Sequence, residues 1–292
     1  MNLPQSLPRA VAATCFATLL SAGLAGAPAF AQPAPAAKVE SPAAKESEEF
    51  KPQVGQRGKD VIWVPTPQAL VDRMLDMARV TVDDFVIDLG SGDGRTVITA
   101  AKRGVKAMGI EYNPDMVELS TRNAAKEGVS DKASFVKADL FETDFSQASV
   151  ITMFLLSDIN LRLRPKILDM KPGTRIVSNT FDMGDWKSDD MVQAREGCTS
   201  YCRAYFWIVP AKVEGNWKIP DGELSLEQSY QFVTGTLKAG GKSLPVEGRL
   251  RGDQFTFKAG ETEYTGTVSG DTIEGVSKTV VPENKWQATR AK

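Results

Sequence analysis

The chain has 292 residues, of which 42% are hydrophobic and 25% charged, and this composition excludes a wholly disordered chain, a collagen and a disulfide-dense mini-protein. Its 35 Lys and Arg nearly balance its 37 Asp and Glu, giving a net charge of -2, so nothing indicates a surface for nucleic acid or an anionic membrane. Histidine is absent, which removes histidine bases, Ser-His-Asp triads and histidine-ligated metals.

The N-terminal 31 residues have the pattern of a secretory signal peptide. Arg9 is the only charge, an apolar run covers residues 10–25, and residues 29–31 read Ala-Phe-Ala, with small residues where a signal peptidase reads. We therefore expect export, to the periplasm, after cleavage near Ala31. The alternative is an uncleaved membrane anchor, which is disfavoured because the apolar run is shorter than a usual membrane span.

Composition divides the rest of the chain into three predicted parts. Residues 32–58 are dominated by Ala, Pro, Lys, Glu and Ser and are predicted to be a disordered linker. In residues 59–210, apolar runs of strand length alternate with segments of helical period, which predicts an α/β domain with a mostly parallel, Rossmann-like sheet. Residues 211–292 consist of short alternating runs between glycines, which predicts a small antiparallel β-domain of about six to eight strands, a sandwich or a barrel.

The elements of the α/β domain follow from apolar periodicity and from turn residues. Thr66-Pro67 and Asn113-Pro114 each read as a helix N-cap followed by proline at the first helical position, whereas Pro165 is expected to break a later helix. The predicted helices cover residues 68–78, 95–103, 113–128 and, in broken form, 157–170. The predicted strands are 85–88, 105–111, 133–137, 148–154, 175–177 and 205–209, the last paired with the segment before the cysteines.

A glycine-rich turn follows the first predicted strand and reads Asp-Leu-Gly-Ser-Gly-Asp-Gly over residues 88–94. Glycines let a ligand approach the backbone closely, and the helix that follows offers unpaired N–H groups. A dinucleotide fingerprint would place its third glycine at position 95, but that residue is Arg95. The third glycine is Gly94, and the resulting pattern resembles motif I of the class I S-adenosylmethionine-dependent methyltransferases.

Three further positions support this resemblance. Glu111 ends the second predicted strand, where the family has an acid that accepts hydrogen bonds from both ribose hydroxyls, a task that suits the two oxygens of a carboxylate. Asp139 follows the third strand, where the family's acid meets the adenine amino group. Residues 172–175, Pro-Gly-Thr-Arg, resemble the family's turn before the fifth strand.

A closer resemblance covers residues 61–186, in which Trp-Val-Pro-Thr-Pro at 63–67 and Gly-Ile-Glu-Tyr-Asn-Pro at 109–114 are similar to the small protein-lysine methyltransferases. These include the mitochondrial enzymes that act on the ADP/ATP carrier and on the ATP synthase c subunit. The resemblance implies S-adenosyl-L-methionine as cofactor and a closing role for residues 63–66. The implied cofactor-binding residues are Asp88, Gly90, Ser91, Gly92, Gly94, Glu111, Tyr112, Asp139 and Leu140.

Methyl transfer from a sulfonium is an in-line displacement whose catalysis is mostly positioning, and no metal is required. A lysine acceptor must lose a proton, which an apolar slot favours. Residues 154–157, Phe-Leu-Leu-Ser, lack the Asn/Asp-Pro-Pro-Tyr run of amide and adenine amino methyltransferases, which disfavours those acceptors. The candidate acceptor pocket has four aromatic residues as walls, Trp63, Phe154, Phe181 and Trp186, and two residues that would orient the acceptor, Asn179 and Asp182. For the aromatic residues, ordinary core packing is the alternative.

Several alternatives stay open on the sequence alone. S-adenosylmethionine is made in the cytosol, so an exported chain is either an enzyme supplied from there or a non-catalytic protein that binds an adenosine-type ligand. The acceptor is a protein lysine or a small molecule, and a nicotinamide oxidoreductase is disfavoured by the glycine spacing. The β-domain is a stabilising or dimerising appendage or a docking module. Cys198 and Cys202 form a short-loop disulfide or stay as two free thiols.

Overall fold

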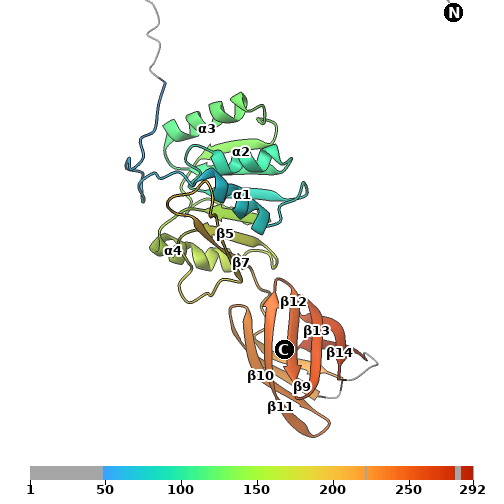
Figure 1. Ribbon diagram of the computed structural model, residues 1–292. Coiled ribbons are helices and arrows are strands. Elements are labelled where there is room, and N and C mark those ends of the chain that lie inside the picture. The colour runs from blue at the N-terminus through green and yellow to red at the C-terminus, as the bar shows by residue number, and fades with distance from the viewer. Residues whose placement is uncertain (1–48, 221, 280–283, 292) are drawn as a thin grey trace, which may run out of the picture. The chain divides into compact units, whose positions relative to one another are not determined.

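The computed structural model describes residues 49–220, 222–279 and 284–291. The predicted signal peptide and residues 32–48 of the predicted linker lie outside this range. The described residues form a seven-stranded sheet with helices on both faces, followed by a closed antiparallel β-barrel (Figure 1). Both parts of the predicted fold class are confirmed, and the β-domain is a barrel and not a sandwich. None of the described helices is long and apolar enough to cross a membrane.

The sheet has the strand order β3-β2-β1-β4-β5-β7-β6, in which the first five strands are parallel and β7 and β6 run antiparallel to their neighbours. The strand order reverses direction between β1 and β4, and the carboxyl ends of parallel strands beside such a reversal are where open α/β sheets bind ligands. The strands are β1 (Phe85–Leu89), β2 (Lys106–Glu111), β3 (Ala133–Lys137), β4 (Val150–Met153), β5 (Arg175–Asn179), β6 (Asp190–Gln193) and β7 (Arg203–Ile208).

Alternating apolar side chains on the strands create a hydrophobic core on each face of this sheet. Val86, Val150 and Val177 pack with α1, α2 and α3 on one face, whereas their neighbours Ile87 and Ile151 pack with α4 on the other. The four helices of the described part of the chain are α1 (Gln68–Met77), α2 (Arg95–Lys102), α3 (Pro114–Lys126) and α4 (Ser157–Leu168).

Two predictions about helix ends and breaks were wrong, and one was confirmed. Asn113 caps α3, because its Oδ1 accepts the N–H of Asp115 at 2.9 Å. At α1 the N-cap is Pro67, not Thr66, since the Thr66 hydroxyl instead accepts the amide N–H of Asn179. Pro165 lies inside α4 without breaking it; the buried apolar residues of that helix keep their spacing through the proline, and their burial outweighs one missing hydrogen bond.

The C-terminal barrel closes because β8 pairs with both β9 and β15. Buried Trp217, Phe255 and Phe257 are among the side chains that fill its interior. Residues 235–240, 248–253 and 266–271 each run from a strand into a tight turn that contains a glycine, which fits the predicted pattern of short runs between glycines. The strands are β8 (Gly215–Ile219), β9 (Gly222–Ser229), β10 (Phe232–Ala239), β11 (Lys242–Arg251), β12 (Gln254–Ala259), β13 (Thr262–Ser269), β14 (Thr272–Lys278) and β15 (Asn284–Arg290).

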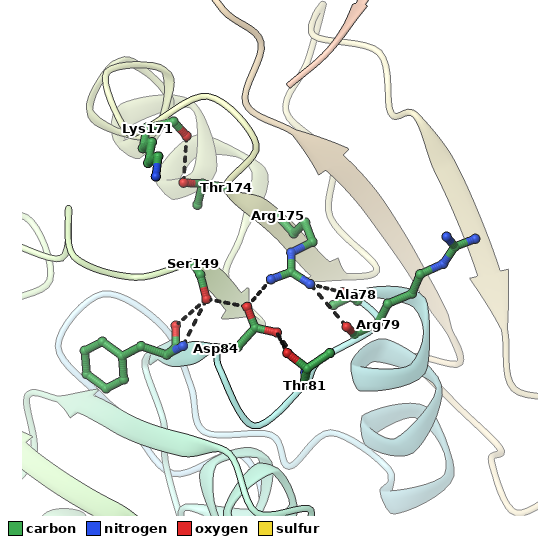
Figure 2. A network of polar contacts seen from close by, with 9 residues as sticks. Ala78, Arg79, Thr81, Asp84, Ser149, Lys171, Thr174 and Arg175 are labelled. Carbon is green, nitrogen blue, oxygen red and sulfur yellow. Dashed lines mark hydrogen bonds and ion pairs between the residues drawn. The ribbon is translucent and has the colours of Figure 1, made fainter. Parts of the chain in front are cut away.

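A polar network joins the amino ends of β1, β4 and β5, at the sheet edge opposite the carboxyl ends (Figure 2). The guanidinium of Arg175 forms an ion pair with Asp84 and donates to the carbonyls of Ala78 at 2.7 Å and Arg79 at 3.2 Å. Asp84 also accepts a hydrogen bond of 2.7 Å from Ser149. The Pro-Gly-Thr-Arg turn at 172–175 therefore anchors the sheet to the end of α1.

Candidate functional site

The glycine turn between β1 and α2 adopts a backbone that glycine alone accepts without strain. Gly90, Gly92 and Gly94 have φ angles of 75°, 54° and 83°, all in the left-handed region. A Cβ at Gly92 would lie 2.6 Å from Nε1 of Trp63, and one at Gly94 would lie 2.7 Å from the ring of Phe135. The three glycines thus let the backbone turn sharply while Trp63 packs closely against it.

Glu111, at the carboxyl end of β2, fixes the position of this turn. Its Oε2 accepts the backbone N–H of Gly92 at 2.9 Å, and its Oε1 accepts the N–H of Asn113 at 2.9 Å. Each carboxylate oxygen can accept more than one hydrogen bond, so both can still accept hydrogen bonds from a ligand. Glu111 holds the glycine turn and presents acceptors to a ligand with the same carboxylate.

Asp88 lies on β1 with only 6% of its surface exposed. Burial raises the pKa of its carboxyl group to about 7, and the nearby charges of Asp93 and Glu111 act in the same direction. The hydroxyl of Thr152 donates to Oδ1 of Asp88 at 2.6 Å, which opposes the shift without cancelling it. A buried carboxyl group with a raised pKa at a strand end is typical of a functional site.

Asp139 forms an ion pair with Lys59, a residue that no sequence motif indicates. Its Oδ2 forms an ion pair with Lys59, and its Oδ1 accepts the backbone N–H of Phe141 at 2.9 Å. The hydrogen bond from Lys59, followed by that from Phe141, holds the pKa of Asp139 below its ordinary value. The ammonium group of Lys59 also lies 4.9 Å from the ring centroid of Tyr112, within the range of a cation–π contact.

Lys59 reaches Asp139 from a short hairpin formed by residues 55–63. The N–H of Gly55 donates to the carbonyl of Trp63 at 2.9 Å, and that of Trp63 donates to Gln56 at 2.8 Å. The last residues of the predicted linker thus belong to this hairpin. No local pattern identifies Lys59, because its partner lies 80 residues further along the chain; only the folded hairpin brings them together.

One cavity collects most of the predicted cofactor-binding residues at the carboxyl edge of the sheet. Gly94 does not line it, because that residue packs against Phe135 and Ser120 beneath the turn. Trp63 and Phe154 of the candidate acceptor pocket also line the cavity, together with residues 56–62 of the hairpin. The predicted cofactor-binding residues on its wall are Asp88, Gly90, Ser91, Gly92, Glu111, Tyr112, Asp139 and Leu140.

The other acceptor candidates lie outside this wall. Asn179 is fully buried, and its amide donates to Thr66 at 3.2 Å while its oxygen accepts from Thr180 at 2.8 Å. Trp186 is fully buried between Trp207 and Tyr230, as core packing requires. Asp182 is exposed and accepts the N–H of Gly184.

Phe181 lies near the cavity without lining it. Its ring stacks on that of Phe154, with the two centroids 6.0 Å apart, and Phe154 is itself part of the cavity wall. The structure brings Phe154 and Phe181 together. Their assignment to an acceptor pocket stays a prediction.

Cys198 and Cys202 are joined by a disulfide bond. Of the two alternatives that the sequence left open, a short-loop disulfide and two free thiols, the structure has the disulfide. The bridge closes the loop between β6 and β7, which lies next to the carboxyl end of β5 because β5 and β7 are paired.

Comparison with known proteins agrees with the geometry. The family described as ANTKMT methyltransferase domain matches residues 88–190. A protein-lysine N-methyltransferase of Saccharolobus islandicus is 43% identical over 152 residues, which cover 51% of this chain and 94% of that relative. This chain belongs to the same methyltransferase family. The predicted resemblance is thereby confirmed.

Two further similar proteins are an enzyme from an animal and a solved structure. The lysine N-methyltransferase of the ATP synthase c subunit from Homo sapiens is 35% identical over 128 residues, covering 44% of this chain and 54% of that enzyme. A crystal structure of an RNA methyltransferase from Salinibacter ruber in complex with S-adenosyl-L-homocysteine is 43% identical, covers 51% of this chain and 96% of that chain, and has a TM-score of 0.48.

The residues of the cavity fit S-adenosyl-L-methionine, the cofactor of this family. Glu111 offers two acceptor oxygens to ribose hydroxyls. The glycine turn leaves space for a ligand that side chains would fill: a Cβ added at Gly90 would lie 3.1 Å from the side chain of Leu155. The hydroxyl of Ser91 is buried and has no hydrogen-bond partner among the described residues, so a ligand would satisfy it. Among the described residues no group of acids and cysteines is arranged to hold a metal ion.

Proposed function

We propose that this protein transfers a methyl group from S-adenosyl-L-methionine to the side-chain amine of a lysine in another protein. The observation that carries the proposal is the single cavity in which the glycine turn, Glu111 and Asp139 meet Trp63 and Phe154. The identity of 43% with a protein-lysine N-methyltransferase supports the acceptor class.

The cofactor, when bound, supplies a methyl group activated by its positively charged sulfur. Glu111 and Asp139 would bind the nucleoside by accepting hydrogen bonds from its hydroxyl and amino groups. The hairpin that carries Lys59 and Trp63 forms a wall of the same cavity and reduces access of water. These residues act by holding two reactants in line, which by itself lowers a barrier by ~7–11 kcal/mol.

The acceptor amine must be uncharged to attack, and this chain has no histidine to remove the proton. The apolar side of the cavity, lined by Met153, Phe154, Leu155 and Ile159, supplies the alternative. Desolvation disfavours the ammonium form of lysine and lowers its pKa. The proton then leaves to water before the amine enters the apolar part of the cavity.

We further propose that the mature protein works outside the cytosol, in the periplasm. The Cys198–Cys202 bridge supports this, because disulfides persist in oxidising compartments. The mass of the protein isolated from its own cells tests the location: a chain that begins after Ala31 supports export, whereas an intact N-terminus in a cytosolic fraction contradicts it.

The activity is tested with purified protein, S-adenosylmethionine labelled in the methyl group, and proteins of the cell envelope. We expect the label in mono- or higher methylated lysine, identified by mass spectrometry of the digested acceptors, and its loss in Glu111→Gln. Gly173→Ala, at the opposite edge of the sheet, serves as the matched control and should retain the activity. Cofactor binding without any transfer would instead support a non-catalytic binding protein, and label confined to small molecules would contradict a protein acceptor.

A further inference from the structure

Two aromatic side chains, those of Phe181 and Tyr201, pack against Phe154 of the cofactor cavity. Phe154 lines the cavity, and its ring centroid lies 6.0 Å from that of Phe181 and 5.1 Å from that of Tyr201. Phe154 and Phe181 are half-buried, whereas Tyr201 is 42% exposed. Tyr201 is therefore the outermost member of an aromatic wall whose inner end is the methyl-transfer cavity.

Backbone contacts hold the two loops of this wall against each other. The N–H of Thr180, beside Phe181, donates to the carbonyl of Arg203 at 2.8 Å. The carbonyl of Phe181 accepts hydrogen bonds from the hydroxyl of Ser178 at 2.6 Å and from the amide of Asn160 at 3.2 Å. The loop after β5 is thus fixed, and it gives the loop before β7 a rigid neighbour.

The disulfide fixes the loop that carries Tyr201. Cys198 and Cys202 enclose three residues, and Tyr201 has a φ of 54°, a left-handed conformation that is unfavourable for a residue other than glycine. The carbonyl of Cys202 accepts the N–H of Ala194 at 2.8 Å, which ties the closed loop to the end of β6. A backbone in this conformation persists when its surroundings determine it, and such positions cluster at ligand-binding sites.

A lysine side chain has the shape and charge that this wall can recognise. Aromatic faces pack against its four methylene groups and attract its ammonium group. Asp182, which follows Phe181 in the chain, is an exposed acidic residue. A protein acceptor would enter past Tyr201 and lose its hydration shell on the way to Phe154.

We infer that Tyr201, held by the Cys198–Cys202 disulfide, is a specificity-determining residue that forms the outer wall of the slot for the acceptor lysine. This inference rests on the proposed function and adds to it a residue and an oxidised loop. It makes acceptor recognition depend on the disulfide, whereas cofactor binding, which uses Glu111 and Asp139, does not.

The test compares acceptor and cofactor binding in variants of the full mature chain. The probe is a five-residue peptide with a central lysine and blocked termini, titrated by calorimetry into protein saturated with S-adenosyl-L-homocysteine. We expect Tyr201→Ala to weaken peptide binding about fivefold and Tyr201→Phe to restore it. The affinity for S-adenosyl-L-homocysteine and the unfolding midpoint should not change. Phe232→Ala removes an aromatic residue of similar exposure, 44%, from the barrel and should leave peptide binding unchanged.

The disulfide is tested with the double variant Cys198→Ser, Cys202→Ser and with a reducing agent. We expect weaker peptide binding in the double variant, by about threefold, and the same loss when the wild type is reduced. The reducing agent should have no effect on the double variant, which excludes an action elsewhere in the chain.

The outcomes separate this inference from the proposed function. Unchanged peptide binding in Tyr201→Ala, or no binding of the peptide by the wild type, overturns the slot. If Tyr201→Ala methylates lysine in envelope proteins with the KM of the wild type, the proposed slot is also overturned, and the proposed function stays intact. Peptide binding that needs Tyr201, without methyl transfer to any lysine, would instead contradict the proposed function.

Discussion

Two carboxylates on either end of β1 show what distinguishes the two edges of the sheet. Asp84, just before the strand, is buried, which by itself raises its pKa, but Ser149, Thr81 and the guanidinium of Arg175 together hold that pKa below its ordinary value. Asp88, four residues later, is buried without a cationic partner among the described residues, and its pKa rises to about 7. One acid is fully paired within the protein, and the other is not.

This difference indicates what each edge does. When a buried charge is paired and hydrogen-bonded, removal of its partner strongly destabilises the fold. A buried acid without a cation, in contrast, makes folding less favourable. Proteins keep such unfavourable groups where they bind or react with something else. The amino edge of this sheet is therefore structural, and the carboxyl edge is the binding edge.

The largest expected effect is the pH dependence of stability that Asp88 causes. The folded protein keeps this proton to about pH 7, while the unfolded chain releases it near 3.8, so the folded state binds more protons in that interval. Stability should fall as the pH rises from about 4 to about 7, by about 4 kcal/mol. Asp88→Asn should remove this decline, as measured by denaturant unfolding at several pH values, and a decline that persists in the variant would contradict the assignment.

A somewhat smaller effect is expected at the opposite edge from Arg175→Met. The substitution keeps much of the apolar stem but leaves Asp84 without its cation and the carbonyls of Ala78 and Arg79 without their donor. We expect a loss of about 3 kcal/mol in the free energy of unfolding, together with unchanged affinity for S-adenosyl-L-homocysteine below the unfolding temperature. A large loss of cofactor affinity would mean that the two edges are not independent.

Glu111→Gln should show the reverse pattern. An amide in place of the carboxylate directs its N–H₂ toward one of two backbone N–H groups and offers fewer acceptors to the ribose. We expect cofactor affinity to fall by about 2 kcal/mol, roughly 30-fold, with a smaller change in stability. Calorimetry with S-adenosyl-L-homocysteine measures the first quantity and denaturant unfolding the second; equal losses in both would erase the contrast with Arg175.

The smallest effect is expected from Gly173→Ala. Gly173 has a φ of 94°, but an added Cβ would meet no atom within 4 Å, so the cost is the backbone conformation alone, about 1 kcal/mol of stability. Gly92→Ala, where the Cβ would lie 2.6 Å from Trp63, is the comparison: it should also weaken cofactor binding. If both variants behave alike, the close packing at Gly92 has no role in the site.

The sequence predicted the parts of the site that depend on local pattern. Asp88, the glycine turn and Glu111 were found because each follows a recognisable strand and because parallel strands end at one edge. The alternation of strand-length runs with helical segments likewise predicted the parallel sheet, and glycine-bounded runs predicted a small antiparallel β-domain, with sandwich and barrel left open. These features repeat within a few residues, which is the range over which a sequence can be interpreted alone.

The sequence did not predict what depends on contacts between distant segments. Lys59 pairs with a residue 80 positions away, and Tyr201 reaches Phe154 through a loop that joins two strands late in the chain. Thr66 does not cap α1, because its hydroxyl oxygen accepts a hydrogen bond from the amide of Asn179 on β5. The resemblance of residues 172–175 to a family turn predicted the turn before β5. Only the structure shows that Arg175 in this turn binds Asp84, at the sheet edge opposite the cavity.

Closure of the barrel limits how another polypeptide can attach to this protein. Each barrel strand has a hydrogen-bonded neighbour on both sides, although β15 and β8 pair over only two residues of each strand, so an incoming segment finds little free strand backbone to pair with. The open sheet differs, since β3 and β6 each have one side without a neighbouring strand among the described residues. Among the described strands, β3 and β6 of the methyltransferase sheet therefore offer a longer free edge for strand addition than the barrel does.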